Sequence, residues 1–130
     1  MIAAGPLFRE TMSLTQADFD LFARVSGDDN PIHVDPGFSA RTRFGRTVSH
    51  GMLLYSLLWG LVRRHIPGAR QLSQSLMFPA PTFAGEPFIC TGIIDRVEAG
   101  TAHLTFSIQR ADDGETVCSG AATLDLGAAS

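Results

Sequence analysis

An aspartate and a histidine lie five residues apart in the segment FARVSGDDNPIHVDPGFS, which runs from Phe22 to Ser39. A glycine and a proline in this segment disfavour a continuous helix, so we expect Asp28 and His33 to lie in a loop. A carboxylate that takes a proton from water, beside an imidazole that holds the oxygen or relays the proton, supports acid/base chemistry on a water molecule. The alternative is that both residues only satisfy nearby backbone groups, as many turn residues do.

A second candidate element, Ser49-His50-Gly51, stands where a long apolar segment begins. The start of a helix presents unpaired N–H groups and positive potential, which suit a carbonyl oxygen that gains negative charge. The Gly51 amide is therefore a candidate donor to the carbonyl oxygen of a thioester. A glycine that merely starts the helix is the ordinary alternative.

Three residues near these groups are candidate supporting residues. Asn30 could orient the Asp28 carboxylate, and it could also stabilise the turn before Pro31. His50 could face a ligand, but a histidine bonded to a backbone carbonyl is the simpler interpretation. Ser49 could contact a substrate.

Other kinds of site find less support. Asp28, His33 and His50 could converge on a metal ion, but no HExxH, HxH or cysteine pair accompanies them, so we expect no metal. The GxSxG turn of a Ser-His-Asp hydrolase is absent. Two arginine clusters could meet the phosphates of a coenzyme A or carrier-protein arm, or could simply be solvated: Arg41, Arg43 and Arg46, and Arg63 and Arg64.

Composition limits the class of protein. A chain of 130 residues with 45% hydrophobic and 18% charged residues indicates a single domain, residues 1–130, with a substantial core. The net charge is −3, which argues against nucleic-acid binding. No apolar run approaches the ~20 residues of a membrane span, and the N-terminus does not resemble a secretory signal. Cys90 and Cys118 are expected to be buried free thiols of a cytoplasmic protein.

The helices expected around the candidate residues follow from apolar spacing and from breakers. Residues 16–25 form a helix capped by Ser13 or Thr15, residues 28–36 a loop, and residues 37–42 a short helix. Residues 51–65, GMLLYSLLWGLVRRH, form a long helix that is apolar nearly all round and is therefore expected to be covered on several sides.

Strands are expected on both sides of this helical region. Alternating apolar and polar residues, with hairpin signals at Ala99-Gly100 and Asp112-Asp113-Gly114, predict antiparallel pairing. The sequence therefore predicts an α+β fold in which a curled antiparallel sheet wraps around the long helix. The two outer strands would stay unpaired unless a second copy covers them, so we expect a dimer. The predicted strands are residues 7–12, 69–78, 87–97, 101–111 and 116–126.

Together these residues resemble the MaoC-like, hotdog-fold family of (R)-specific enoyl-CoA hydratases and dehydratases. The similarity continues through FGRTVSHGM and LSQSLMFPAPTFAGEPF, so it covers most of the chain. Ser49 is the mild departure, since an alanine is commoner there. The residues that fill the family's signature are Phe22, Val25, Ser26, Gly27, Asp28, Asn30, Pro31, Ile32, His33 and Ser39.

The resemblance implies a hotdog fold, paired subunits and specific roles. Asp28 and His33 match the dyad that activates water, Asn30 the accompanying asparagine, and Gly51 the residue whose N–H binds the thioester carbonyl. The expected activity is hydro-lyase chemistry of fatty acid metabolism: (R)-specific hydration of a trans-2-enoyl thioester, or the reverse dehydration. Coenzyme A or an acyl-carrier pantetheine would enter as part of the substrate, with no separate cofactor. A hotdog thioesterase and a non-catalytic acyl-thioester-binding module are the alternatives.

Overall fold

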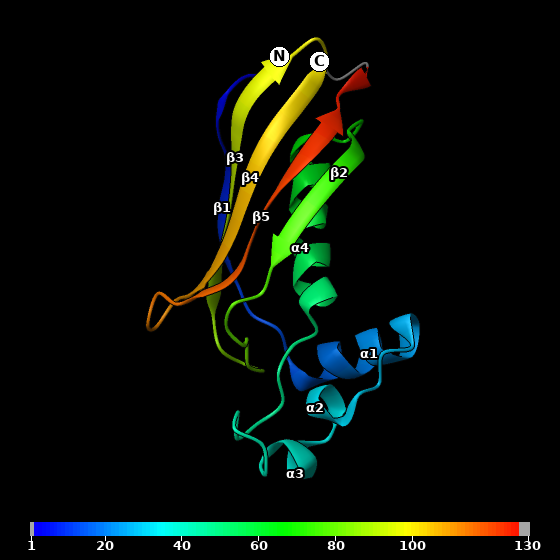
Figure 1. The fold of residues 1–130 in the computed structure, drawn as a ribbon, viewed down its shortest axis with the longest axis vertical. Helices are drawn as coiled ribbons and strands as arrows, with labels where there is room; N and C mark the ends of the chain where they lie inside the picture. Colours follow the sequence, from blue (N-terminus) through cyan, green and yellow to red (C-terminus); the bar gives the residue numbers. More distant parts are fainter. Residues whose placement is uncertain (1, 128–130) are drawn as a thin grey trace.

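The computed structural model of the chain describes residues 2–127. Five antiparallel strands form one sheet in the order β1-β3-β4-β5-β2 (Figure 1). Every predicted strand is confirmed, with ends within two residues of the prediction. The strands are β1 (Gly5–Met12), β2 (Arg70–Met77), β3 (Phe88–Glu98), β4 (Thr101–Arg110) and β5 (Thr116–Asp125).

The long helix α4, Gly51–His65, has the predicted bounds and runs along one face of the sheet (Figure 1). Leu58 and Val62 are fully buried against the strands. The expectation that the helix is covered on several sides is wrong for one stripe, since Met52, Ser56 and Gly60 are exposed in the single chain. The helix therefore packs on the sheet with one face and leaves a narrow opposite face uncovered.

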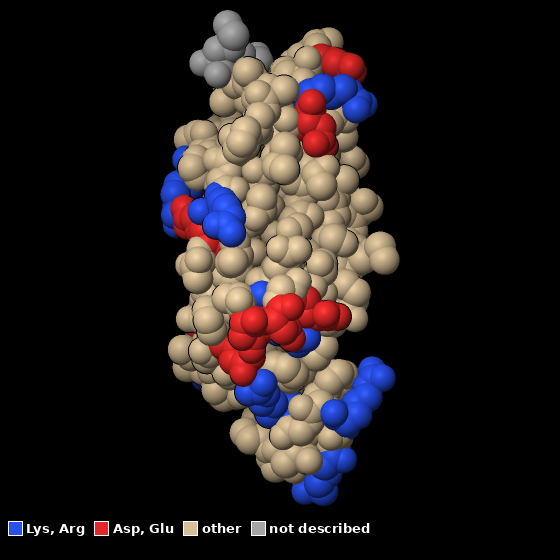
Figure 2. All heavy atoms as spheres, turned by 90° about the vertical axis from the view of Figure 1, so that its left-hand side faces the viewer, with Lys and Arg blue, Asp and Glu red and all other residues tan. Residues whose placement is uncertain are grey.

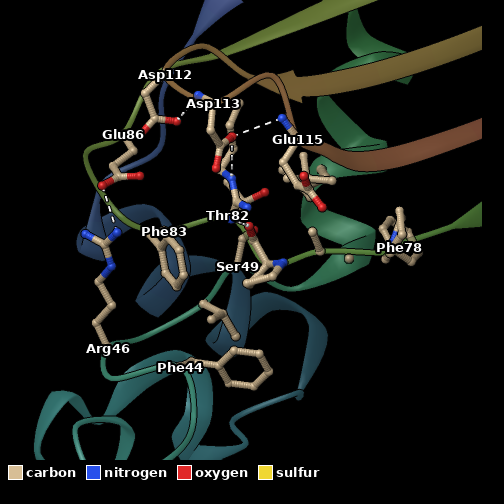
Figure 3. Close-up of a pocket in the computed structure, with 18 of the residues that line it drawn as sticks. Phe44, Arg46, Ser49, Phe78, Thr82, Phe83, Glu86, Asp112, Asp113 and Glu115 are labelled. Atoms are coloured by element: carbon tan, nitrogen blue, oxygen red, sulfur yellow. Dashed lines mark hydrogen bonds and ion pairs between the residues drawn. The ribbon is translucent and has the colours of Figure 1, made fainter.

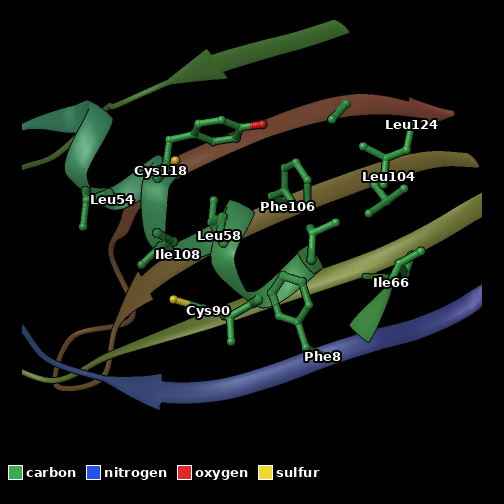
Figure 4. Close-up of a cluster of buried hydrophobic side chains, with 14 of the residues drawn as sticks. Phe8, Leu54, Leu58, Ile66, Cys90, Leu104, Phe106, Ile108, Cys118 and Leu124 are labelled. Atoms are coloured by element: carbon green, nitrogen blue, oxygen red, sulfur yellow. The ribbon is translucent and has the colours of Figure 1, made fainter. Parts of the chain in front are cut away.

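The core lies between α4 and the concave face of the sheet (Figure 4). Strand β4 alternates buried and less buried residues, and its buried set includes Leu104, Phe106 and Ile108. The thiols of Cys90 and Cys118 are free and buried in this core, as predicted. Burial is the largest cause that raises their pKa values, to about 12 and about 11 respectively, so both thiols stay protonated at neutral pH.

Three shorter helices precede α4, and they correct part of the sequence prediction. Helix α1, Gln16–Ser26, begins with a capping box on Thr15 and ends at Gly27, whose φ of 80° is left-handed. The predicted loop is wrong for Pro31–Val34, which forms the helical turn α2. Helix α3 spans Pro36–Ser39 rather than 37–42. Both turns place a proline in the first helical turn, where its missing N–H costs nothing.

No helix in the described part of the chain is both long enough and apolar enough to cross a bilayer.

Gly120 provides a test of the packing between β5 and β2. A Cβ added there would lie 2.1 Å from the backbone oxygen of Ser75, so Gly120→Ala must separate the two strands. We expect a loss of about 1–3 kcal/mol in the free energy of unfolding, measured by urea denaturation. Gly60→Ala is the matched control, because no atom lies within 4 Å of its added Cβ and alanine favours a helix. Equal stability of the two variants would contradict this account of the sheet.

Candidate active site

The candidate acid/base pair comes together at the junction of α1 and α2. Gly27 ends α1, and Asp28 follows in the connection to α2, on which His33 lies. The Nε2 atom of His33 is 3.9 Å from Oδ2 of Asp28. The His33 side chain is 14% exposed and the Asp28 side chain 56% exposed, so solvent reaches the pair from the aspartate side. The structure thus brings together the two residues that the sequence placed first.

A hydrogen bond fixes which nitrogen of His33 faces Asp28. Nδ1 lies 2.8 Å from the backbone oxygen of Val48, and a carbonyl oxygen only accepts, so Nδ1 carries the hydrogen. The neutral ring therefore presents the lone pair of Nε2 to the Asp28 carboxylate. The backbone N–H of Val48 in turn donates to the oxygen of Ile32 at 3.1 Å. These two bonds hold α2 against the segment that leads into α4.

Two acceptors separated in this way can share one water molecule. A water at hydrogen-bond distance, about 2.8 Å, from both atoms would subtend an angle of about 90°, close to the angle between its own hydrogens. It could then donate one hydrogen to Oδ2 of Asp28 and one to Nε2 of His33. The arrangement can polarise a water oxygen toward an electrophile and remove its proton.

His50 is the third member of this cluster and lies beneath the pair. Its ring is 2% exposed and stacks on the His33 ring, with centroids 3.8 Å apart and an interplanar angle of 24°. Asp28, His33 and His50 each offer a metal-ligand atom, and these atoms lie within 4.8 Å of one another, so the three side chains do converge. These short separations suit proton transfer among the three side chains.

The remaining sequence candidates have clear local roles. Asn30 caps α2, because its Oδ1 accepts the N–H of Ile32 at 3.1 Å. Its turn-stabilising role is thereby confirmed, and its contact with Asp28 is a weak one from its own backbone N–H to Oδ1, at 3.5 Å. The Ser49 hydroxyl donates to the backbone oxygen of His50 at 3.0 Å. The Ser49 amide donates to the oxygen of Thr82 at 2.8 Å, which joins the start of α4 to the loop after β2.

Gly51 is the first residue of α4, and its amide has no acceptor among the described residues. The amide is therefore available to bind a carbonyl oxygen, at the positive end of a 15-residue helix. A glycine is also needed at this position for a steric reason. A Cβ on Gly51 would lie 2.9 Å from the ring of Phe78, which packs directly over this residue.

A groove of about 760 Å³ opens beside Gly51 (Figure 3). Ser49, Gly51 and Phe78 line it near the start of α4, and Phe83 stands in its wall. The groove does not include Asp28 or His33, so the single chain presents the acid/base pair and the groove as adjoining features rather than as one cavity. Its lining mixes apolar side chains with charged ones, and with the Gly51 amide it suits an extended ligand that carries both apolar and polar groups, among them a carbonyl.

Charged side chains of both signs border the groove. Glu86, Asp112, Asp113 and Glu115 are its acidic lining residues, and acidic side chains gather visibly on the face shown in Figure 2. The amide of Glu115, as the largest cause, lowers the pKa of Asp113, and Arg110 acts in the same direction.

The fold places only one of the two arginine clusters, the predicted candidates for phosphate contacts, beside the groove. Arg43 and Arg46 line the groove, whereas Arg64 lies at the far end of α4 and pairs with Glu10 at 3.3 Å. Arg46 stacks on the Phe83 ring and pairs with Glu86 at 2.8 Å. The second cluster, Arg63 and Arg64, does not line the groove.

Sequence analysis missed two polar residues that hold α2 in place. Gln16, in the first turn of α1, donates to the backbone oxygen of His33 at 2.9 Å and accepts from the Thr47 hydroxyl at 2.6 Å. Ser39 is fully buried and donates to the backbone oxygen of Ile32 at 3.1 Å. These contacts join residues distant in the chain, so no local pattern signals Gln16. Ser39 appeared only as the last residue of a signature.

Comparison with known proteins gives a consistent result. Residues 1–93 match the family described as MaoC like domain. The chain is 47% identical over 87 residues to an (R)-specific enoyl-CoA hydratase of Aeromonas caviae, covering 65% of each chain. It is 35% identical over 89 residues to a mitochondrial 3-hydroxyacyl-[acyl-carrier-protein] dehydratase of Arabidopsis thaliana, covering 68% of this chain and 54% of the relative. The matched segment thus spans about half to two thirds of these relatives.

Solved structures extend the likeness to nearly the whole fold. The (R)-hydratase from A. caviae involved in PHA biosynthesis superposes with a TM-score of 0.89 at 32% sequence identity, and the match covers 96% of both chains. The predicted hotdog arrangement of curled sheet and long helix is therefore confirmed.

Gln16→Glu tests whether this side chain holds the candidate site. The variant keeps the size of the side chain and the acceptor for Thr47, but it places a carboxylate oxygen against the His33 carbonyl in place of a donor. We expect the free energy of unfolding at neutral pH to fall by about 1–3 kcal/mol, since a partly buried carbonyl loses its partner. Gln109→Glu, at an exposed residue of the internal strand β4, is the matched control and should change stability little. Equal effects of the two variants would remove this role from Gln16.

Proposed function

We propose, because this chain belongs to the MaoC-like domain family, that it hydrates trans-2-enoyl thioesters to (R)-3-hydroxyacyl thioesters and catalyses the reverse dehydration. The observation that carries the proposal is the pair of facing acceptors, Oδ2 of Asp28 and Nε2 of His33, at 3.9 Å. The (R) configuration rests on the printed names of the relatives, among them the (R)-specific hydratase of A. caviae.

The proposed reaction begins with polarisation of the thioester carbonyl. The free Gly51 amide at the N-terminus of α4 donates to the carbonyl oxygen, on which negative charge develops as the double bond is attacked. Loss of one such donor typically costs about 2.7–4 kcal/mol of transition-state stabilisation. Because polarisation draws electrons from C3, that carbon becomes the electrophile.

Water then adds across the C2–C3 double bond. Asp28 and His33 hold the water, and one of them removes its proton as the oxygen bonds to C3. The electron pair of the double bond moves toward the thioester carbonyl as an enolate, and C2 then accepts a proton from the pair. Atoms and charge balance, because the reaction only adds water. Coenzyme A or a carrier pantetheine enters as part of the substrate, so no separate cofactor takes part.

The groove provides the proposed path for that arm. Arg43 lines it and has no ion-pair partner among residues 2–127, whereas Arg46 is paired with Glu86. Arg43 is therefore the arginine best suited to a phosphate of the arm. We place the protein in the cytoplasm, where the free thiols of Cys90 and Cys118 would remain reduced.

Substitution of the pair tests the reaction. We expect Asp28→Asn and His33→Ala each to lower kcat for hydration of crotonyl-CoA by about 10²–10⁴-fold, because each removes one acid/base group. Loss of enoyl absorbance measures hydration, and free thiol appearing instead would identify a thioesterase. His103→Ala on β4 is the matched control and should leave turnover unchanged. Near-normal turnover of both site variants, with folding intact, would refute the assignment, and tight thioester binding without turnover in the unaltered chain would favour a binding module.

We propose further that the chain functions as a homodimer or higher homo-oligomer that covers strand β2. The outer edge of β2 pairs with no strand in the described part of the chain, and six of its eight residues are exposed. Two large apolar side chains, Met77 and Phe78, lie exposed at its end, at 66% and 42%. An unpaired strand with exposed apolar residues is an edge that proteins normally cover.

Light scattering of a charged variant tests this arrangement. Met77→Glu places a charge on the proposed interface and should convert the assembly toward single chains at low micromolar concentration. Ile93→Glu is the matched control, since it introduces the same charge at an exposed apolar residue of the internal strand β3. A single-chain mass for the unaltered protein would contradict the proposed assembly.

A further inference from the structure

His50 occupies an unusual position for a buried histidine. It is the N-cap residue of α4, yet its side chain makes no capping bond to the helix. Its ring turns instead toward the loop after α1 and is 2% exposed. A buried polar ring normally has interaction partners, and because His50 does not cap the helix, its partners lie outside α4.

One contact is a hydrogen bond to the backbone of the proposed acid/base pair. Nε2 of His50 lies 2.9 Å from the backbone oxygen of Asp28. Because that oxygen accepts, Nε2 carries the hydrogen, and Nδ1 is left with a lone pair. Nδ1 is itself buried and has no hydrogen-bond partner among the described residues. The bond thus fixes both the ring and the backbone that carries the Asp28 carboxylate.

The other contacts are with two rings. His33 stacks on one face of His50 at 3.8 Å between centroids. Phe22 of α1 meets the ring in an edge-on arrangement at 4.8 Å and 62°. His50 is therefore the one described side chain that both bonds the backbone of Asp28 and supports the ring of His33.

We infer that His50 is a positioning residue for the proposed reaction, which acts as a neutral ring with its hydrogen on Nε2 to hold Asp28 and His33 at the separation that one water bridges. The effect of His50 on catalysis, as inferred here, rests on the proposed function. The geometry itself, a bond to one member of the pair and a stack on the other, is independent of that function.

The neutral state follows from the surroundings of the ring. A proton on Nδ1 would be buried without an acceptor and would repel a proton on the stacked His33. Burial is the largest cause that lowers the pKa of His50 and His33 lowers it further, while the Asp28 carbonyl and carboxylate act in the opposite direction. These are the titratable and charged groups that face it. The His50 ring is therefore neutral at neutral pH.

A pair of amide variants tests the hydrogen bond. The side-chain nitrogen of glutamine reaches about as far as Nε2 of histidine, whereas that of asparagine reaches only about as far as Nδ1. We expect His50→Asn to lower kcat for crotonyl-CoA hydration about 10²-fold with little change in KM, because the pair is displaced while the groove is intact. His50→Gln should stay within about tenfold of the unaltered chain. His65→Asn, on the same helix and also stacked on a ring, is the matched control and should be silent.

Nitrogen NMR of the unaltered protein tests the ring state without any assay. The expected spectrum shows a neutral His50 ring at neutral pH, with its hydrogen on Nε2. A hydrogen on Nδ1 of His50, or a protonated His50 ring at neutral pH, would overturn the inference, as would equal kcat values for the asparagine and glutamine variants. Absence of hydratase activity in the unaltered chain would instead count against the proposed function and leave the NMR result to decide the role of His50.

Discussion

Val48 forms two hydrogen bonds that join α2 to the segment before α4: its amide donates to the oxygen of Ile32, and its oxygen accepts from Nδ1 of His33. Each bond contributes only about 1 kcal/mol of net stability, but together they determine which nitrogen of the His33 ring points toward Asp28. Val48 precedes Gly51 by three residues. The same link therefore brings the proposed acid/base pair close to the free amide at the start of α4.

The link can hold a fixed geometry because the helix it leads into is anchored in the core. Leu58, Leu61 and Val62 of α4 are almost completely buried against the sheet, and burial of each such side chain is worth about 1.5–3 kcal/mol. That apolar contact fixes the position of the helix N-terminus. The polar loop around Asp28 then needs only a few side-chain bonds, from Gln16 and Ser39, to be placed against it.

The sequence predicted those parts of the structure that local chemistry decides. Helix α4 was predicted with its observed bounds because one nearly uninterrupted apolar run begins at Gly51 and ends in basic residues at His65. The turn α2 was missed because Pro31 was interpreted as a helix breaker, although proline also suits the first turn of a helix. The predicted bond from His50 to a backbone carbonyl is confirmed, but the identity of that carbonyl, Asp28, and the role of Gln16 could not be predicted, since both depend on contacts between residues at least 17 positions apart.

The single chain leaves the candidate site more open than its chemistry favours. The Asp28 carboxylate is 56% exposed, and the groove reaches Gly51 without reaching the pair. Electrostatic stabilisation of an enolate-like oxygen is strongest where water is excluded, because a lower effective dielectric strengthens every charge interaction. The chain itself supplies the directional groups: the carboxylate, the imidazole and the helix amide. The proposed assembly, if it covers the exposed stripe of α4 and the unpaired edge of β2, would supply the cover that excludes water.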